Sequence, residues 1–224
     1  MTGKPRHIVF KIYHRLLAGY GPQYWWPGNS PFEVIIGAIL TQSAAWVNVE
    51  KAIDNLKAAG ALSPKAILKM PSEELAQLVR PSGYYNAKAL KLKAFVEWLD
   101  KSCSSSLDAL SPVPTGDLRN RLLSVHGIGN ETADSILLYA LKRPVFVIDA
   151  YTRRITSRIG LLSENNGYIE CQKYFMNNLP IDVQLFNEYH ALIVRLGKEA
   201  CRKNPDCTKC CLQDICLYYG KTGK

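Results

Sequence analysis

The chain has 224 residues, 47% of them apolar and 21% charged, which is the composition of a globular protein able to bury a substantial core in one or two domains. No apolar run approaches the length of a membrane span, and the N-terminal segment lacks a signal-peptide pattern, so the sequence predicts a cytosolic protein rather than a membrane or secreted one. The formal charge of +9, from 28 Lys and Arg against 19 Asp and Glu, favours a polyanionic partner such as nucleic acid.

Apolar residues recur at helical spacing along most of the chain, without convincing β-alternation. Pro31 and the pair Ser63-Pro64 are typical of helix starts, and Ser72-Glu73-Glu74-Leu75 is typical of a capping box. The predicted helices cover residues 6–19, 31–40, 44–59, two short segments that start at 63 and 72, and then 86–101, 130–141, 150–159, 168–177 and 183–200. The sequence therefore predicts a nearly all-α protein.

The segment GPQYWWPGNSP separates the first two predicted helices. Its two glycines and three prolines break the helical pattern, and the break carries Trp25 and Trp26. Trp46, in contrast, falls within an amphipathic helix, where an aromatic residue more often packs in the core.

A tight turn, Gly127-Ile128-Gly129, lies between two helical segments. Glycine permits positive φ and leaves backbone N–H groups open, and the helix that follows directs its positive dipole end toward the turn. These features suit a phosphate, although a short helix–helix turn uses glycine for purely structural reasons as well.

An acidic residue, Asp149, follows the apolar run Val145–Ile148 and precedes a predicted helix. Such a residue can cap the helix through its side chain. It can also supply a carboxylate for chemistry, and the two roles are compatible.

Five of the seven cysteines fall near the C-terminus. Clustered cysteines in a cytosolic protein favour metal binding over disulfides. The gaps of five, two and five residues offer four thiolates in one short loop, and these residues alone leave a [4Fe–4S] cluster and tetrahedral zinc open. The four candidate ligands are Cys201, Cys207, Cys210 and Cys216, with Cys211 as a possible substitute.

The hairpin GIGNETA followed by VIDAYTRR resembles the helix-hairpin-helix and Gly/Pro…Asp element of the endonuclease III superfamily of DNA glycosylases. The resemblance implies a two-lobed all-α fold with a six-helix barrel over residues 29–140. Residues 1–28 and 141–224 would form a second helical domain that carries the iron–sulfur cluster loop, 201–216. The resemblance also implies that Gly127, Ile128 and Gly129 bind a DNA phosphate and that Asp149 is catalytic.

This resemblance favours a [4Fe–4S] cluster over zinc, although the first cysteine gap is one residue shorter than the family pattern. The cluster would be structural, pinning a loop whose Arg202, Lys203 and Lys209 can meet phosphates.

Bifunctional members of the superfamily carry a lysine in the hairpin that forms a Schiff base with the sugar. Glu131 occupies that position here. The sequence therefore predicts a monofunctional glycosylase that leaves an abasic site.

The segments from Gln23 to Trp46, from Leu78 to Leu92 and from Gly127 to Ala140 resemble the 3-methyladenine DNA glycosylase branch. An N3-alkylated adenine is cationic and a good leaving group, and electron-rich indoles can select it by stacking and cation–π attraction. The resemblance implies a base pocket lined by Trp25, Trp26, Pro27, Trp46 and Lys198.

Further DNA contacts follow from the same resemblance. Gln42, at the end of an apolar helix, would fill the space left by the extruded base, although a capping or solvent-facing role is equally compatible with its position. The loop with Arg80, Ser82 and Gly83 would provide a second wedge or phosphate contact. His126 would support the turn or a phosphate, and the other histidines, His7, His14 and His190, receive no role.

The expected partner is double-stranded DNA with a damaged base, bound by a monomer without membrane contact. Three alternatives stay open: a bifunctional lyase for oxidised pyrimidines, a mismatch-specific adenine or thymine glycosylase, and a catalytically silent iron–sulfur protein that binds DNA structures. Glu131 opposes the first, the early end of the chain after the cysteines opposes an adenine-mismatch enzyme with an added domain, and Asp149 opposes the third.

Overall fold

The computed structural model describes residues 4–222 and places them in two compact units. Unit 1 comprises the described residues up to Trp26 and those from Pro144 onward, and unit 2 comprises Pro27–Arg143. The described residues contain helices and no strand, so the predicted all-α class is confirmed. None of their helices combines the length and the apolarity needed to cross a membrane.

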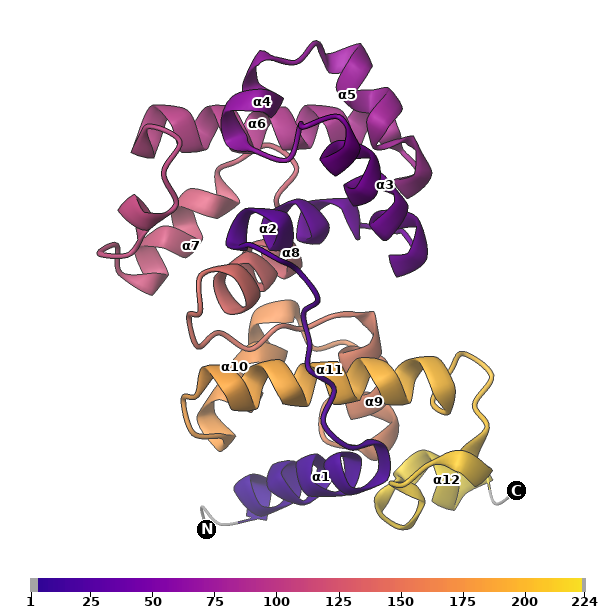
Figure 1. Cartoon of the computed structure of the whole chain (residues 1–224). Coiled ribbons are helices and arrows are strands. Elements are labelled where there is room, and N and C mark those ends of the chain that lie inside the picture. Colours follow the sequence, from indigo (N-terminus) through magenta and orange to yellow (C-terminus); the bar gives the residue numbers. More distant parts are fainter. Residues whose placement is uncertain (1–3, 223–224) are drawn as a thin grey trace. The chain divides into compact units, whose positions relative to one another are not determined.

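Unit 2 is built around a nearly all-buried helix, α2 (Pro31–Leu40), which packs against α3, α6, α8 and η3 (Figure 1). A helix that is apolar on every side is stable only when neighbours cover all of it. The other elements of unit 2 are α3 (Trp46–Ala58), α4 (Pro64–Lys69), α5 (Ser72–Leu78), η1 (Arg80–Ser82), α6 (Tyr85–Cys103), η2 (Asp108–Leu110), α7 (Thr115–Leu123), α8 (Asn130–Ser135) and the π-helical η3 (Ile136–Ala140).

Unit 1 joins the N-terminal helix to the C-terminal part of the chain: α11 lies alongside α1 and α9 (Figure 1). Its core holds stacked rings of Phe146 and Phe175, with centroids 4.2 Å apart, and the Tyr189 hydroxyl donates to the Val9 carbonyl oxygen at 2.9 Å. The elements are α1 (Lys4–Tyr20), α9 (Ala150–Ile159), α10 (Tyr168–Asn178), α11 (Val183–Glu199), η4 (Cys207–Lys209), η5 (Gln213–Ile215) and α12 (Leu217–Thr222).

The predicted helix starts at Pro31 and Pro64 are confirmed, because the hydroxyls of Ser30 and Ser63 accept hydrogen bonds from the backbone N–H three residues later. The capping box predicted at Ser72 is wrong. Pro71 takes the N-cap position in an extended conformation and Ser72 is already helical, so its side chain does not cap α5.

A buried lysine of α6, Lys88, ties the loop around η1 to the end of α2. Its Nζ donates to the carbonyl oxygens of Leu40 at 2.8 Å and Ser82 at 2.5 Å, and the residue is 1% exposed. Burial, with a smaller contribution from the charge of Lys91, lowers the pKa of Lys88 to about 8.

This lowered pKa predicts that the free energy of unfolding rises as the pH is raised from about 8 to about 10, because the unfolded chain keeps the Lys88 proton over this interval and the folded chain loses it. Urea denaturation of wild type and Lys88→Met at several pH values in this interval measures how the free energy of unfolding of each protein changes with pH. The other titrating groups contribute equally to both proteins, so the difference between the two slopes reports Lys88. Lys51→Met removes an exposed lysine and should keep the wild-type slope. Equal slopes for Lys88→Met and wild type would contradict the assignment.

Candidate active site

Asp149 directly follows a buried segment, Val145–Ile148, and is the N-cap of α9. Its Oδ1 accepts two hydrogen bonds from Thr152, from the backbone N at 2.7 Å and from Oγ1 at 2.8 Å. The capping role considered for this residue is therefore present. The carboxylate is at the same time held in one orientation at the positive end of a ten-residue helix.

The second oxygen of Asp149, Oδ2, lies 3.6 Å from Nε2 of His190 on α11. Burial alone would raise the pKa of Asp149, but the interaction with His190 and the two bonds from Thr152 outweigh it, so that this pKa lies below its ordinary value. The arrangement maintains a buried, ionised carboxylate. Sequence reasoning assigned His190 no role, and Thr152 could have been found from the N-cap spacing.

Trp25 and Trp26, in the segment that separates the first two helices, belong to unit 1. The rings of Trp25 and Trp26 meet edge to face, with centroids 5.5 Å apart, and Nζ of Lys198 lies 5.8 Å from the Trp25 centroid. The backbone N of Gln23 donates to Oε1 of Glu188 on α11 at 2.7 Å, which ties the break to that helix. Three of the five predicted pocket residues, Trp25, Trp26 and Lys198, are thus brought together.

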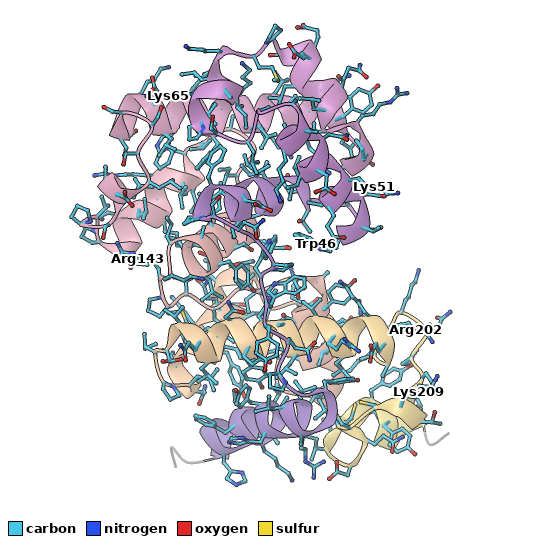
Figure 2. The ribbon with its side chains drawn as sticks, in the orientation of Figure 1. Trp46, Lys51, Lys65, Arg143, Arg202 and Lys209 are labelled. Carbon is cyan, nitrogen blue, oxygen red and sulfur yellow. The ribbon has the colours of Figure 1, made fainter. Side chains whose placement is uncertain are left out.

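The other two predicted pocket residues belong to unit 2. Pro27 is exposed, and Trp46, labelled in Figure 2, is the first residue of α3. Its Nε1 donates to Oε1 of Glu50 at 2.6 Å. Trp46 therefore lies at a helix start and is only half-buried, in contrast to a core residue.

The hairpin between α7 and α8 adopts the expected tight turn. Gly127 has φ +81°, Ile128 is buried, and Gly129 is exposed. A Cβ on Gly127 would lie 2.3 Å from Cγ of Lys91, whereas a Cβ on Gly129 would meet no atom within 4 Å. Gly127 is required by the fold, whereas the space beside Gly129 is open.

The two hairpin glycines should therefore respond differently to alanine. Gly127→Ala is expected to destabilise unit 2 by about 1–3 kcal/mol, since it combines positive φ with a clash against Lys91. Gly129→Ala is the matched control and should lower the melting temperature much less, because Gly129 has φ −93° and only the N-cap preference of glycine over alanine is lost. Equal melting temperatures for the two variants would contradict the geometry.

A polar network connects the segment after α2 to the hairpin. Nε2 of Gln42 donates to the Gly127 carbonyl oxygen at 3.1 Å and to Oγ1 of Thr132 at 3.0 Å, and its Oε1 accepts from Nζ of Lys91. Sequence reasoning did not identify Lys91, which comes from α6. In this structure the Gln42 amide bonds protein groups, so filling the space of an extruded base would require it to exchange these partners.

Of the three DNA contacts predicted in the loop at η1, one residue is buried and two are exposed. Ser82 is buried and its hydroxyl donates to the Val79 carbonyl oxygen at 2.7 Å, which closes the turn. Arg80 is exposed, with its guanidinium 5.8 Å from the Tyr85 ring centroid, and Gly83 has φ +70° on the surface.

The four predicted cysteine ligands line one cavity in unit 1, together with Arg158 and Tyr218. Burial raises the pKa of Cys210 to about 11, partly opposed by a hydrogen bond with the Leu212 backbone, and the neighbouring cysteines add smaller contributions in the raising direction. Cys211 lies apart from this cavity, against Gly19 of α1. Among residues 4–222, no three His, Cys, Asp or Glu side chains are arranged to hold a single metal ion.

The loop between these cysteines carries exposed cations. Figure 2 shows the labelled side chains of Arg202 and Lys209 on this C-terminal segment, and Lys209 pairs with Asp206 at 3.0 Å. Arg158 donates to the carbonyl oxygens of Arg202 and Lys203 at 2.6 and 2.9 Å, so the cysteine loop is anchored to α9.

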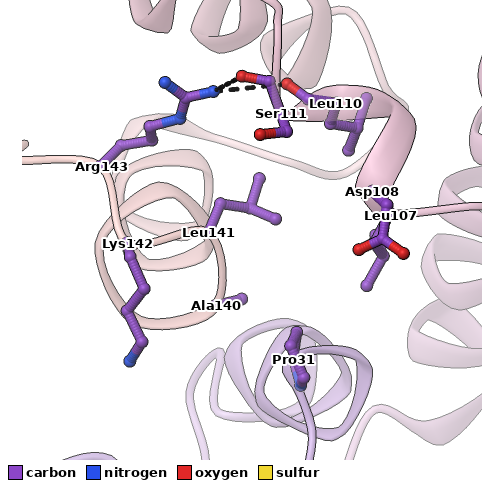
Figure 3. A pocket seen from close by; sticks show the side chains of 9 residues that line it. All are labelled: Pro31, Leu107, Asp108, Leu110, Ser111, Ala140, Leu141, Lys142 and Arg143. Carbon is purple, nitrogen blue, oxygen red and sulfur yellow. Dashed lines mark hydrogen bonds between the residues drawn. The ribbon is translucent and has the colours of Figure 1, made fainter.

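Unit 2 also contains a cavity of about 370 Å³. Its lining includes Pro31, Asp108 and Lys142, and Figure 3 shows Arg143 reaching across to the carbonyl oxygens of Leu110 and Ser111. None of the predicted site residues lines it.

Known proteins resemble this chain over most of its length. Residues 36–180 match the family model described as HhH-GPD superfamily base excision DNA repair protein. Over 211 residues the chain is 46% identical to the protein named "Putative DNA repair glycosylase MJ1434" of Methanocaldococcus jannaschii, covering 94% of this chain and 96% of that protein.

Two solved structures superpose on the chain. The crystal structure of H. pylori 3-methyladenine DNA glycosylase bound to 1,N6-ethenoadenine has a TM-score of 0.74 at 31% identity, covering 87% of this chain and 97% of that one. A trapped endonuclease III–DNA covalent intermediate has a TM-score of 0.84 over 98% of this chain and 99% of that one. At 21% identity, this second likeness shows the fold alone.

Proposed function

The chain belongs to the HhH-GPD superfamily of base excision DNA repair proteins, and from this premise we propose that it is a monofunctional DNA glycosylase that removes alkylated purines such as 3-methyladenine. The predicted membership in the endonuclease III superfamily is confirmed, and the family supports glycosylase activity. The substrate, the lack of lyase activity and the roles of individual residues are parts of the proposal.

The observation that carries the proposal is the buried carboxylate of Asp149. A glycosylase turns the target nucleotide out of the duplex and breaks the bond between base and sugar. The bonding electrons leave with the base, positive charge develops on the sugar, and water then adds to the sugar carbon. An ionised carboxylate in a site of low dielectric stabilises that charge and can accept the proton of the water.

The substrate class rests on the indole rings and on the 31%-identical 3-methyladenine DNA glycosylase structure. A cationic purine departs as a neutral base, so recognition by stacking takes the place of strong acid catalysis. Trp25 and Trp26 offer aromatic faces for cation–π attraction, worth about 1–2 kcal/mol when desolvated. Because the Lys198 ammonium already lies over one face of Trp25, the base would stack on Trp26 or on the opposite Trp25 face.

For DNA binding we propose the open backbone at Gly129, with Gly127 and Ile128 shaping the turn, and the exposed Arg80 and Gly83 of the η1 loop. The buried Ser82 would keep that loop in shape. Gln42 would reach the duplex after exchanging its bonds to the hairpin.

The four cysteines that line one cavity suit a [4Fe–4S] cluster, which takes four thiolates and would lower their pKa values by its charge. Cys201, Cys207, Cys210 and Cys216 would hold it, and Cys211, which packs against α1, would not. Zinc is the second candidate. Iron and sulfide analysis with a visible spectrum distinguishes them.

A panel of duplexes, each with one lesion, tests the proposed reaction. We expect release of free base from DNA that contains 3-methyladenine, no release from oxidised-pyrimidine or mismatched duplexes, and no covalent adduct with borohydride, since Glu131 replaces the hairpin lysine. Lys91 lies across Gly127, close to the hairpin. Lys91→Met is therefore the control that shows whether this lysine forms any adduct that is detected. An adduct, or processing of oxidised or mismatched duplexes alone, would overturn the proposal.

A further inference from the structure

The two carboxylate oxygens of Asp149 have different surroundings. Oδ1 accepts from both the backbone N and the hydroxyl of Thr152. A carboxylate oxygen has about two lone-pair sites, so Oδ1 has no capacity left for a water or a sugar. Chemistry at Asp149 must therefore use Oδ2.

His190 faces this reacting oxygen. Its Nε2 lies 3.6 Å from Oδ2, and the side chains of Asp149 and His190 are 11% and 8% exposed. The ring is carried on α11, which packs against both α9 and α1, so its position is fixed by the core of unit 1. An interaction between such groups acts in a low dielectric and is stronger than one at the surface.

We propose that His190 is a positioning residue that holds Oδ2 of Asp149 in the orientation needed for base excision. The inference rests on the proposed function. The bonds of Thr152 hold Oδ1 from within the first turn of α9. His190 adds a contact to Oδ2 from a second helix, α11, and leaves one lone pair of Oδ2 for the substrate or the attacking water.

A matched pair of variants tests this role. His190→Gln keeps a side-chain N–H that can donate to Oδ2, whereas His190→Met has a similar length and no such donor. We expect His190→Met to lower the single-turnover rate of base release by about 10- to 100-fold with an unchanged Kd for DNA, the loss typical of removing a supporting partner. His190→Gln should restore most of the rate.

Tyr189→Phe is the control for a general loss of packing. It removes a buried hydrogen bond from the same helix, to the Val9 carbonyl oxygen, without touching Asp149. This variant should melt at a lower temperature and keep the wild-type rate. If His190→Met fails to fold, His190→Asn replaces it, since its amide is too short to reach Oδ2.

The outcomes separate this role from the reaction itself. If wild type releases no base from any duplex of the panel, the proposed function falls. If wild type is active and Asp149→Asn is not, while His190→Met keeps the wild-type rate or loses as much rate as His190→Gln, only the positioning role falls.

Discussion

Replacing Asp149 with asparagine should lower the rate of base release by about 10³-fold or more, because the amide cannot stabilise the positive charge that develops on the sugar. Asparagine is as good an N-cap as aspartate, so the bond to the Thr152 backbone N and the start of α9 should survive. The substitution therefore isolates the charge. Single-turnover assays on methylated duplex DNA measure the effect.

Asp182 provides the matched control for this experiment. It is the N-cap of α11, and its side chain accepts from the backbone N of Leu185 at 2.7 Å, the same bond that Asp149 makes with Thr152. Asp182→Asn should leave the rate unchanged. A fully active Asp149→Asn enzyme would rule out the assigned catalytic role.

Arg119→Met should lower the free energy of unfolding by about 3–5 kcal/mol, since it removes the cation beside a buried carboxylate. Nε and Nη2 of Arg119 donate to the two oxygens of Asp134 at 2.7 and 3.0 Å, and Nη2 also donates to Oδ1 of Asn130 at 2.9 Å. Asp134 is 0% exposed. This fork joins α7 to α8 and so holds the two helices of the hairpin. Urea denaturation measures the loss.

The exposed pair Arg195–Glu199 on α11 provides a comparison. Arg195→Met should cost about 0.5 kcal/mol or less, because exposed ion pairs contribute little. Adding Asp134→Leu to Arg119→Met should recover much of the lost stability, as the buried charge is then gone. A loss below about 1 kcal/mol for Arg119→Met alone would contradict the role of the fork.

The starts of many helices in this protein depend on local sequence. The starts at Pro31 and Pro64, the hairpin at Gly127 and the helix after Asp149 depend on neighbours within one turn, and all four could be predicted. The failure at Ser72 is local too, because a preceding proline took the cap position. The π-helical η3 lies within a segment predicted as one regular helix, 130–141, and it packs against α2, which is distant in sequence.

The surroundings of the candidate site depend on residues that are distant in sequence. His190 reaches Asp149 from another helix, and Lys91 reaches Gly127 from α6, and neither is marked by any local motif. Cys211 looks like a substitute ligand in the sequence because it adjoins Cys210. A chain that turns at this point sends the two side chains to different neighbours.

The discontinuous make-up of unit 1 also constrains the order in which the protein can assemble on the ribosome. α1 is translated before unit 2, whereas its packing partner α11 is translated after it. Unit 2 is continuous and can fold once its own helices have emerged, whereas α1 can pack against α11 only after α11 has emerged. The contact between α1 and α11 closes a loop that contains all of unit 2, and closing a long loop has an entropic cost. We therefore expect this contact to form after unit 2 has folded.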